Sequence, residues 1–213
     1  MINAGVSGGD SVYSYMHLKR RMIEYHPDLI ILGFNSTDVG DIMVRGGLER
    51  FGPDGLITFR SGPWWEWIYA SSYSVRHLVH DVLRHERHIL SSRKVLLEEE
   101  NRAFEKIHAV VAKCNELAQE IEARFLLAYH PLTGEVQRAR LDFQEFFETL
   151  RKETTVPTLD VLDCFLNSVG MSKHNVWDYY WKIDRHHNAR GYAALAQCVA
   201  GHLIESGWVA RTR

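Results

Sequence analysis

An aspartate and two histidines lie close together in the segment Asp184-Arg185-His186-His187-Asn188. An Asp two residues before a His, in an extended segment that enters a helix, can reach the imidazole and fix its tautomer. That is the orienting half of a Ser-His-Asp arrangement. The same residues also suit a helix N-cap with two solvated histidines. The segment alone leaves both interpretations open.

Asn35 directly follows the most apolar run of the chain, residues 29–34. At the end of a strand, its side-chain amide can donate a hydrogen bond to a developing oxyanion, which lowers a barrier by roughly 3 kcal/mol. An isolated Asn at a strand end can equally cap its own turn, so this residue does not settle the chemistry by itself.

A third segment of interest, residues 3–10, reads NAGVSGGD. A glycine-rich turn into a helix N-terminus exposes backbone N–H groups that can stabilise an anion. The Gly5-x-x-Gly8 spacing lacks the G-x-G-x-x-G fingerprint, so a dinucleotide-binding Rossmann domain is a distant alternative. Taken alone, the segment is best interpreted as a tight strand-to-helix turn.

Together, these segments resemble the characteristic blocks of the SGNH (GDSL) family of serine hydrolases, in order and in approximate spacing. Residues 3–8 resemble its second block, residues 26–35 lead into its third, and residues 184–191 resemble its last. The resemblance implies an α/β fold, a three-layer α/β/α sandwich with a mostly parallel, flavodoxin-like sheet. It also implies hydrolysis or transfer of an ester acyl group without a metal or organic cofactor.

The resemblance also assigns roles to individual residues. Asp184 and His186 would be the catalytic pair, and His187 is the alternative base because the family also uses an Asp-x-x-His spacing. The backbone N–H of Gly8 and the side chain of Asn35 would line the oxyanion hole. The third block departs from the family's Gly-x-Asn-Asp, because Ser36-Thr37-Asp38 follows the asparagine here.

The family's nucleophilic serine lies in a Gly-Asp-Ser turn ahead of the second block, so we expect it upstream of Met1. The chain's own Gly9-Asp10-Ser11 follows the second block and has no apolar strand before it. We therefore expect Ser11 to start a helix. Ser7, nearer the expected oxyanion hole, ranks below an upstream serine.

A chain without the first block is expected to be a weak or inactive esterase with an apolar sheet edge, which favours homo-oligomers. The alternative function is a non-catalytic remnant of the fold that binds a ligand or a partner. The substrate stays open among short acyl esters, lipids and acylated carbohydrates.

Alternating apolar runs and amphipathic segments predict a doubly wound sheet, with sites at the C-terminal ends of its strands. The expected helices cover residues 10–26, 94–122, 140–152 and 188–206, and the expected strands cover residues 29–34, 125–129 and 159–162. The continuous apolar character of residues 29–34 predicts a strand covered on both faces. Residues 39–93 are expected to be an insertion or lid-like segment of a single domain, residues 1–213.

Composition and charge exclude other classes of protein. Of the 213 residues, 46% are hydrophobic and 24% charged, which is typical of an ordinary folded protein. A net charge of −2 gives no electrostatic case for binding nucleic acid. No apolar run is long enough to span a membrane. No signal segment opens the sequence, which favours the cytoplasm.

The remaining reactive residues predict no metal site. Cys114, Cys164 and Cys198 are far apart and odd in number, so we interpret them as buried core residues, with no disulfide framework, in a reducing compartment. The histidines of residues 77–88 alternate with arginines that would repel a cation, and a solvated helix face suits them better.

Several aromatic residues precede the Asp-His segment and are well placed to shape a substrate cleft: Trp177, Tyr179, Tyr180 and Trp181.

Overall fold

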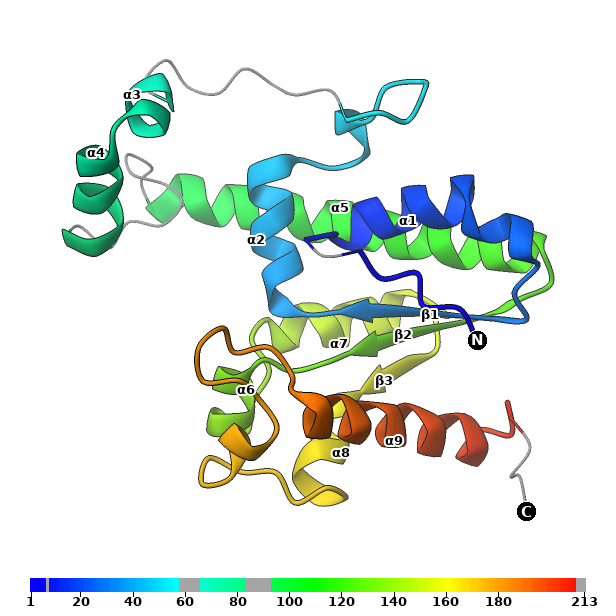
Figure 1. Ribbon diagram of the computed structural model, residues 1–213. Coiled ribbons are helices and arrows are strands. Elements are labelled where there is room, and N and C mark those ends of the chain that lie inside the picture. Colours follow the sequence, from blue (N-terminus) through cyan, green and yellow to red (C-terminus); the bar gives the residue numbers. More distant parts are fainter. Residues whose placement is uncertain (7, 58–65, 83–92, 210–213) are drawn as a thin grey trace. The chain divides into compact units, whose positions relative to one another are not determined.

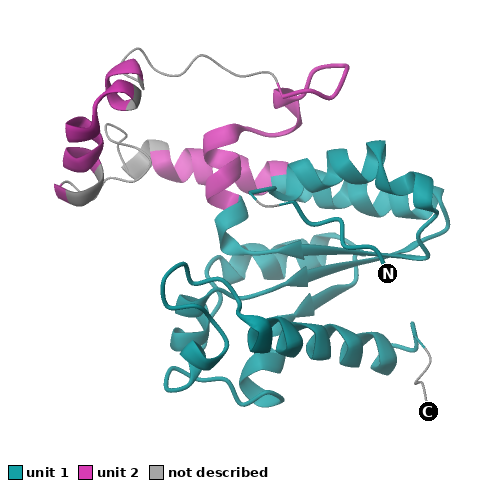
Figure 2. Ribbon diagram, viewed as in Figure 1, with its two compact units in different colours: residues 1–38, 107–213 teal, residues 39–106 magenta. Residues whose placement is uncertain are grey.

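The computed structural model of the chain describes residues 1–6, 8–57, 66–82 and 93–209. The chain divides into two compact units, which Figure 2 distinguishes by colour. The first unit comprises residues 1–38 and 107–213, and it contains the sheet and the candidate site residues. The second unit comprises residues 39–106.

The first unit is built on a parallel sheet, in which the described residues form three strands in the order β1 (Leu29–Phe34), β2 (Arg124–Tyr129) and β3 (Thr158–Asp160). The register pairs Leu29 with Arg124 and Phe34 with Tyr129, so β1 and β2 end at the same edge of the sheet (Figure 1). Parallel neighbours need long crossovers, which helices supply here. The predicted α/β class is therefore confirmed.

Two helices of the sheet unit begin after residues with capping side chains. α1 (Ser11–Arg20) starts after Asp10, whose carboxylate accepts a hydrogen bond of 2.9 Å from the Tyr13 N–H. α9 (Ala189–Glu205) starts after Asn188, which accepts from the Gly191 N–H at 3.1 Å. These side chains satisfy backbone donors that a helix start leaves free. In Figure 1, α1 and α9 lie on opposite sides of the sheet.

The other helices agree with the expected pattern in part. The expected helix 10–26 stops at Arg20 and continues as a 3-10 turn, η1 (Met22–Tyr25). The expected helices 94–122 and 140–152 correspond to α5 (Arg93–Glu120) and α7 (Gln144–Glu153). α6 (Thr133–Arg138) was not anticipated.

A second unanticipated helix, α8 (Val161–Asn167), replaces half of the expected strand 159–162. The strand ends at Asp160, whose side chain accepts a hydrogen bond of 2.9 Å from the Leu162 N–H and caps α8. Val161 and Leu162 are still buried, so their apolar character reports burial but not strand structure.

The strands differ in how far they are covered. β2 is central, and its residues from Phe125 to Tyr129 are buried. On β1, Leu32 and Phe34 are buried, whereas Ile31 on the opposite face is 41% exposed. The expectation that this strand is covered on both faces is wrong, because only one face is packed and, among the described residues, β1 pairs with β2 alone. Association through this edge stays a prediction.

A disulfide joins Cys164 of α8 to Cys198 of α9, with 5.9 Å between the Cα atoms. The interpretation of all three cysteines as unpaired core residues is therefore wrong for this pair, while Cys114 is free and buried. Pairing requires two Cα atoms within bonding range, and the packing of α8 beside α9 provides it. The cysteines no longer favour a reducing compartment.

The second unit contains helices and loops in its described part. Its elements are the end of α2 (Ser36–Arg45), η2 (Leu48–Arg50), α3 (Glu66–Ser71), α4 (Tyr73–His77), η3 (Leu78–Val82) and the start of α5. The expected insertion 39–93 falls in this unit, and its role as a lid stays a prediction. Of the histidines in residues 77–88, His85 and His88 lie outside the described residues. Over the described ranges, no helix is long and apolar enough to cross a membrane.

Candidate functional site

The ends of β1 and β2 bring two polar side chains together. Asn35 follows β1 and His130 follows β2, and the Asn35 Nδ2 lies 3.2 Å from the His130 Nε2. The His130 backbone N–H also donates to the Phe34 carbonyl at 2.9 Å, which continues the ladder between the strands. The predicted location of polar groups at the C-terminal ends of the strands holds for this pair.

Asn35 also caps its own turn. Its Oδ1 accepts hydrogen bonds from the Thr37 N–H at 2.8 Å and the Thr37 hydroxyl at 2.6 Å. The two interpretations of this residue are therefore compatible, because the oxygen holds the turn while the nitrogen points to His130. An amide fixed in this way is a pre-oriented donor, as an oxyanion hole requires.

Asp38 ties the start of α1 to the end of β1. Its Oδ1 accepts from the Ser11 N–H at 2.8 Å and its Oδ2 accepts from the Asn35 N–H at 3.0 Å. Buried charges persist when hydrogen bonds satisfy them, and both oxygens of this buried carboxylate are used. The sequence gives no signal for Asp38 other than its position three residues after Asn35.

The glycine-rich segment lies at this same junction. Ser11 is the first residue of α1, as expected, and is 1% exposed; its hydroxyl has no hydrogen-bond partner among the described residues. Gly8 is exposed and has a φ of 72°, a conformation that favours glycine. Ser7 lies outside the described residues. No hydrogen bond between Gly8 and Asn35 is seen in the described part of the chain.

His187 is buried in a group of rings. Its ring centroid lies 4.2 Å from that of Tyr180, 5.5 Å from Tyr192, 5.8 Å from Phe165 and 5.9 Å from His130. Neither ring nitrogen has a hydrogen-bond partner among the described residues. Through His130, this imidazole belongs to the same cluster as the Asn35 amide.

Burial controls the protonation of both buried histidines. It lowers the pKa of His130 to about 4. It also lowers the pKa of His187 to about 4, with a smaller contribution from repulsion by His130 and His186. Because the charged form of an imidazole is destabilised away from water, both rings are neutral at neutral pH.

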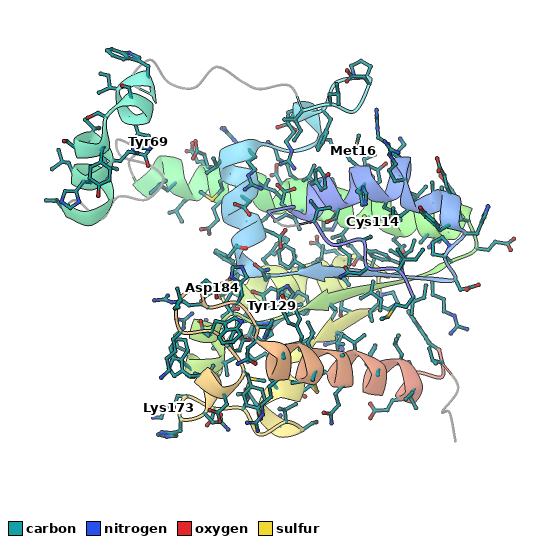
Figure 3. All side chains as sticks on the ribbon, in the orientation of Figure 1. Met16, Tyr69, Cys114, Tyr129, Lys173 and Asp184 are labelled. Carbon is teal, nitrogen blue, oxygen red and sulfur yellow. A yellow bond between two sulfur atoms is a disulfide. The ribbon has the colours of Figure 1, made fainter. Side chains whose placement is uncertain are left out.

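The Asp184–His186 pair has the opposite character. The His186 Nδ1 lies 3.4 Å from the Asp184 Oδ2, and the Asp184 Oδ1 accepts a hydrogen bond of 3.0 Å from the His186 backbone N–H. Both side chains are exposed. Figure 3 shows Asp184 at the same end of the sheet as Tyr129, the last residue of β2. The two side chains lie within 3.4 Å, and their role as a catalytic pair stays a prediction; the imidazole that lies beside His130 is that of the neighbouring His187.

Gly191 explains why the last helix can start so close to His187. A Cβ at this position would overlap the Tyr179 carbonyl oxygen and lie 2.9 Å from the His187 Nδ1. Only a residue without a side chain allows this approach. Gly191 ends the segment 184–191 that resembles the last family block, and the packing of this helix start requires a glycine there.

The described residues contain no cluster of three His, Cys, Asp or Glu side chains that could hold a metal ion. Comparison of the chain with protein-family models, with curated proteins and with solved structures gave no match. The geometry of these residues is therefore the basis for assigning a function.

Proposed function

We propose that this chain carries the acid–base and oxyanion-binding groups of an SGNH-type serine hydrolase site, on a three-layer α/β/α sandwich, and that it acts on acyl esters. The observation that carries the proposal is the contact between Asn35 and His130 beside His187. It joins a donor amide from one strand end to imidazoles from a second strand end and from the entrance to the last helix.

In the proposed reaction, a serine hydroxyl attacks the ester carbonyl while His186 accepts the serine proton and then returns it to the leaving alcohol. Asp184, 3.4 Å from the ring, orients the imidazole and stabilises its protonated form. The Gly8 N–H and the Asn35 amide stabilise the oxyanion of the tetrahedral intermediate.

The position of each histidine argues for a different role. His186 is exposed and paired with a carboxylate, so its second ring nitrogen is open to a substrate. His187 lies beside His130, which contacts Asn35, but a pKa of about 4 makes His187 a weak base at neutral pH. His187 is accordingly the second candidate for the base.

Ser11 is a poor candidate for the nucleophile. A nucleophile must reach the carbonyl carbon of the substrate, and the Ser11 hydroxyl is buried at the start of α1. The reacting serine is therefore best identified by a chemical probe.

The experiment uses protein expressed from its native gene and a fluorophosphonate probe, with the labelled peptide identified by mass spectrometry. We expect one serine to be labelled, and we expect His186→Ala and Asn35→Ala each to slow labelling on the order of 10²-fold or more. His174→Ala, an exposed histidine of a nearby loop, is the matched control and should label normally. The proposal is wrong if no serine reacts, or if neither His186→Ala nor His187→Ala slows the reaction.

Ligand binding without acyl transfer is the second candidate function. The two ring nitrogens of His187 have no partners among the described residues, so a polar ligand that displaces the rings covering them would satisfy them. A binding protein would resist the probe at every serine, yet a non-hydrolysable acyl amide would raise its melting temperature. His187→Phe should abolish that rise.

A further inference from the structure

A short hairpin precedes α9 and is fixed by backbone hydrogen bonds. Tyr180 and His187 form an antiparallel bridge, and the Trp181 N–H donates to the His186 carbonyl at 2.8 Å. The Arg185 N–H donates back to the Trp181 carbonyl at 2.9 Å, and Arg185 has a φ of 61°, which closes the turn. Residues 181–186, called the hairpin tip below, therefore have a defined backbone.

The base of the hairpin is anchored in the core. Tyr180 is buried, and its hydroxyl donates to the Pro131 carbonyl at 2.7 Å. This bond attaches the hairpin to the segment that follows β2. A tip on such a base can contact a partner with little loss of backbone freedom.

The hairpin tip presents large apolar side chains to solvent. Ile183 is 99% exposed and Trp181 is 58% exposed, and the exposed ring of Tyr192 lies in the first turn of α9. Single exposed apolar residues are ordinary. An almost fully exposed Ile and an exposed Trp on one ordered turn, however, form an apolar surface that a binding partner would remove from water.

The charged residues that flank these apolar groups in the sequence are mostly basic. Residues 171–192 carry four basic and two acidic side chains, whereas the whole chain has a formal charge of −2. Both acids have basic or titratable neighbours, since Asp178 lies 3.7 Å from Arg190 and Asp184 lies 3.4 Å from His186. The local charge is therefore opposite in sign to that of the chain as a whole.

Lys182 and Arg185 lie on either side of Ile183 in the sequence, and both are exposed. Basic side chains beside a tryptophan and an aliphatic residue are the combination that binds at the boundary between lipid headgroups and acyl chains. The basic residues are attracted to anionic headgroups, and the apolar residues gain by entering the acyl region.

We propose that the hairpin tip docks on an anionic lipid surface, with Trp181 and Ile183 entering the headgroup region and Lys182 and Arg185 contacting anionic headgroups. The proposal stands on the tip alone and does not depend on ester hydrolysis. The fluorophosphonate test uses no vesicles, so failure of one proposal is distinguishable from failure of the other.

The test is sedimentation of the full chain with sucrose-loaded vesicles of phosphatidylcholine, with and without phosphatidylglycerol. The unaltered protein should pellet with the anionic vesicles, and high salt should weaken this binding. Ile183→Asp and Trp181→Ala should each lower the partition coefficient about tenfold or more. The double variant Lys182→Glu with Arg185→Glu should lower binding to anionic vesicles specifically.

Matched controls come from exposed apolar residues of the second unit. Val44→Asp and Trp67→Ala make comparable chemical changes at exposed residues that are not part of the hairpin tip, and they should leave the partition coefficient unchanged. The proposal is overturned if the unaltered protein does not pellet with anionic vesicles. It is also overturned if the control variants lose as much binding as the tip variants, or if both vesicle types bind equally. Release by an acidic protein instead of by salt would indicate a protein partner and would likewise overturn it.

Discussion

Asn35 and His130 are separated by 95 positions in the chain, and the Nδ2 of one lies 3.2 Å from the Nε2 of the other. An amide NH₂ only donates, so the His130 Nε2 must accept, which places the ring proton on Nδ1. The contact therefore requires a neutral imidazole. Burial supplies this condition because it lowers the pKa of His130 to about 4.

The first prediction concerns stability in mild acid. Unfolded histidines take up protons near pH 6.5, whereas His130 and His187 in the folded chain do so only near pH 4. The stabilisation is therefore complete above pH 6.5 and is lost as the pH falls towards 4, by on the order of 3 kcal/mol for each histidine. Urea unfolding at a series of pH values measures this loss.

Carboxylates also titrate in acid, so the comparison of variants carries this test. His187→Phe should remove about half of the histidines' contribution to the loss of stability between pH 6.5 and pH 4. His174→Phe, at an exposed position, should leave the curve unchanged. If His187→Phe and the unaltered chain lose stability in parallel, His187 is not a buried neutral group.

The second prediction concerns Glu135, a fully buried carboxylate outside the proposed chemistry. It accepts hydrogen bonds from the Tyr129 hydroxyl at 2.6 Å, the Leu132 N–H at 2.6 Å and the Asp142 N–H at 2.7 Å. Glu135→Ala leaves three donors without this acceptor, so we expect a loss of about 3–4 kcal/mol in the free energy of unfolding. Tyr129→Phe removes one donor and should cost about 1 kcal/mol.

Chemical denaturation gives both values, and Glu148→Ala on the exposed face of α7 is the control. Glu148→Ala should change the free energy of unfolding by no more than about 0.5 kcal/mol. A loss for Glu135→Ala no larger than that of the control would show that the network does not hold this corner of the fold.

The third prediction concerns the disulfide between α8 and α9. Closing a loop with a sequence separation of 34 lowers the entropy of the unfolded chain, which corresponds to about 3–4 kcal/mol. Cys164→Ser or Cys198→Ser should therefore lower the melting temperature, and a reductant should lower that of the unaltered chain to a similar value. Cys114→Ala leaves the bond intact, so this variant should still respond to the reductant. A chain whose melting temperature ignores the reductant would lack the bond.

The strands were the most predictable part of the fold. The predicted strand 29–34 coincides with β1, and the predicted strand 125–129 differs from β2 by one residue, because long apolar runs leave few other arrangements. The boundary at Asp160 was missed, since its side chain caps a helix that the apolar pattern alone cannot distinguish from a strand. The sequence pattern predicts burial more reliably than the element that is buried.

The candidate site was predictable only where each residue's role is local. Asn35 and Asn188 lie at element boundaries, which turn and cap preferences locate. The bridge from Asp38 to Ser11 and the contact between His130 and His187 depend on how distant segments pack. The disulfide was missed for the same reason. His186 is exposed and the adjacent His187 is buried, and sequence spacing alone does not show which of the two is the catalytic base.

The last prediction compares two glycines of the same helix. In α9, a Cβ at Gly191 would overlap the Tyr179 carbonyl oxygen and crowd the His187 ring, whereas a Cβ at Gly201 would meet no atom within 4 Å. Alanine is favoured over glycine in a helix by about 1 kcal/mol. Gly201→Ala should therefore raise the free energy of unfolding by up to that amount, and Gly191→Ala should lower it by about 2 kcal/mol as the helix start shifts. Urea unfolding measures both changes, and near-ultraviolet circular dichroism should change only for Gly191→Ala, because only that substitution displaces the rings around His187. Equal effects of the two substitutions would mean that α9 does not approach the Tyr179 carbonyl as closely as described.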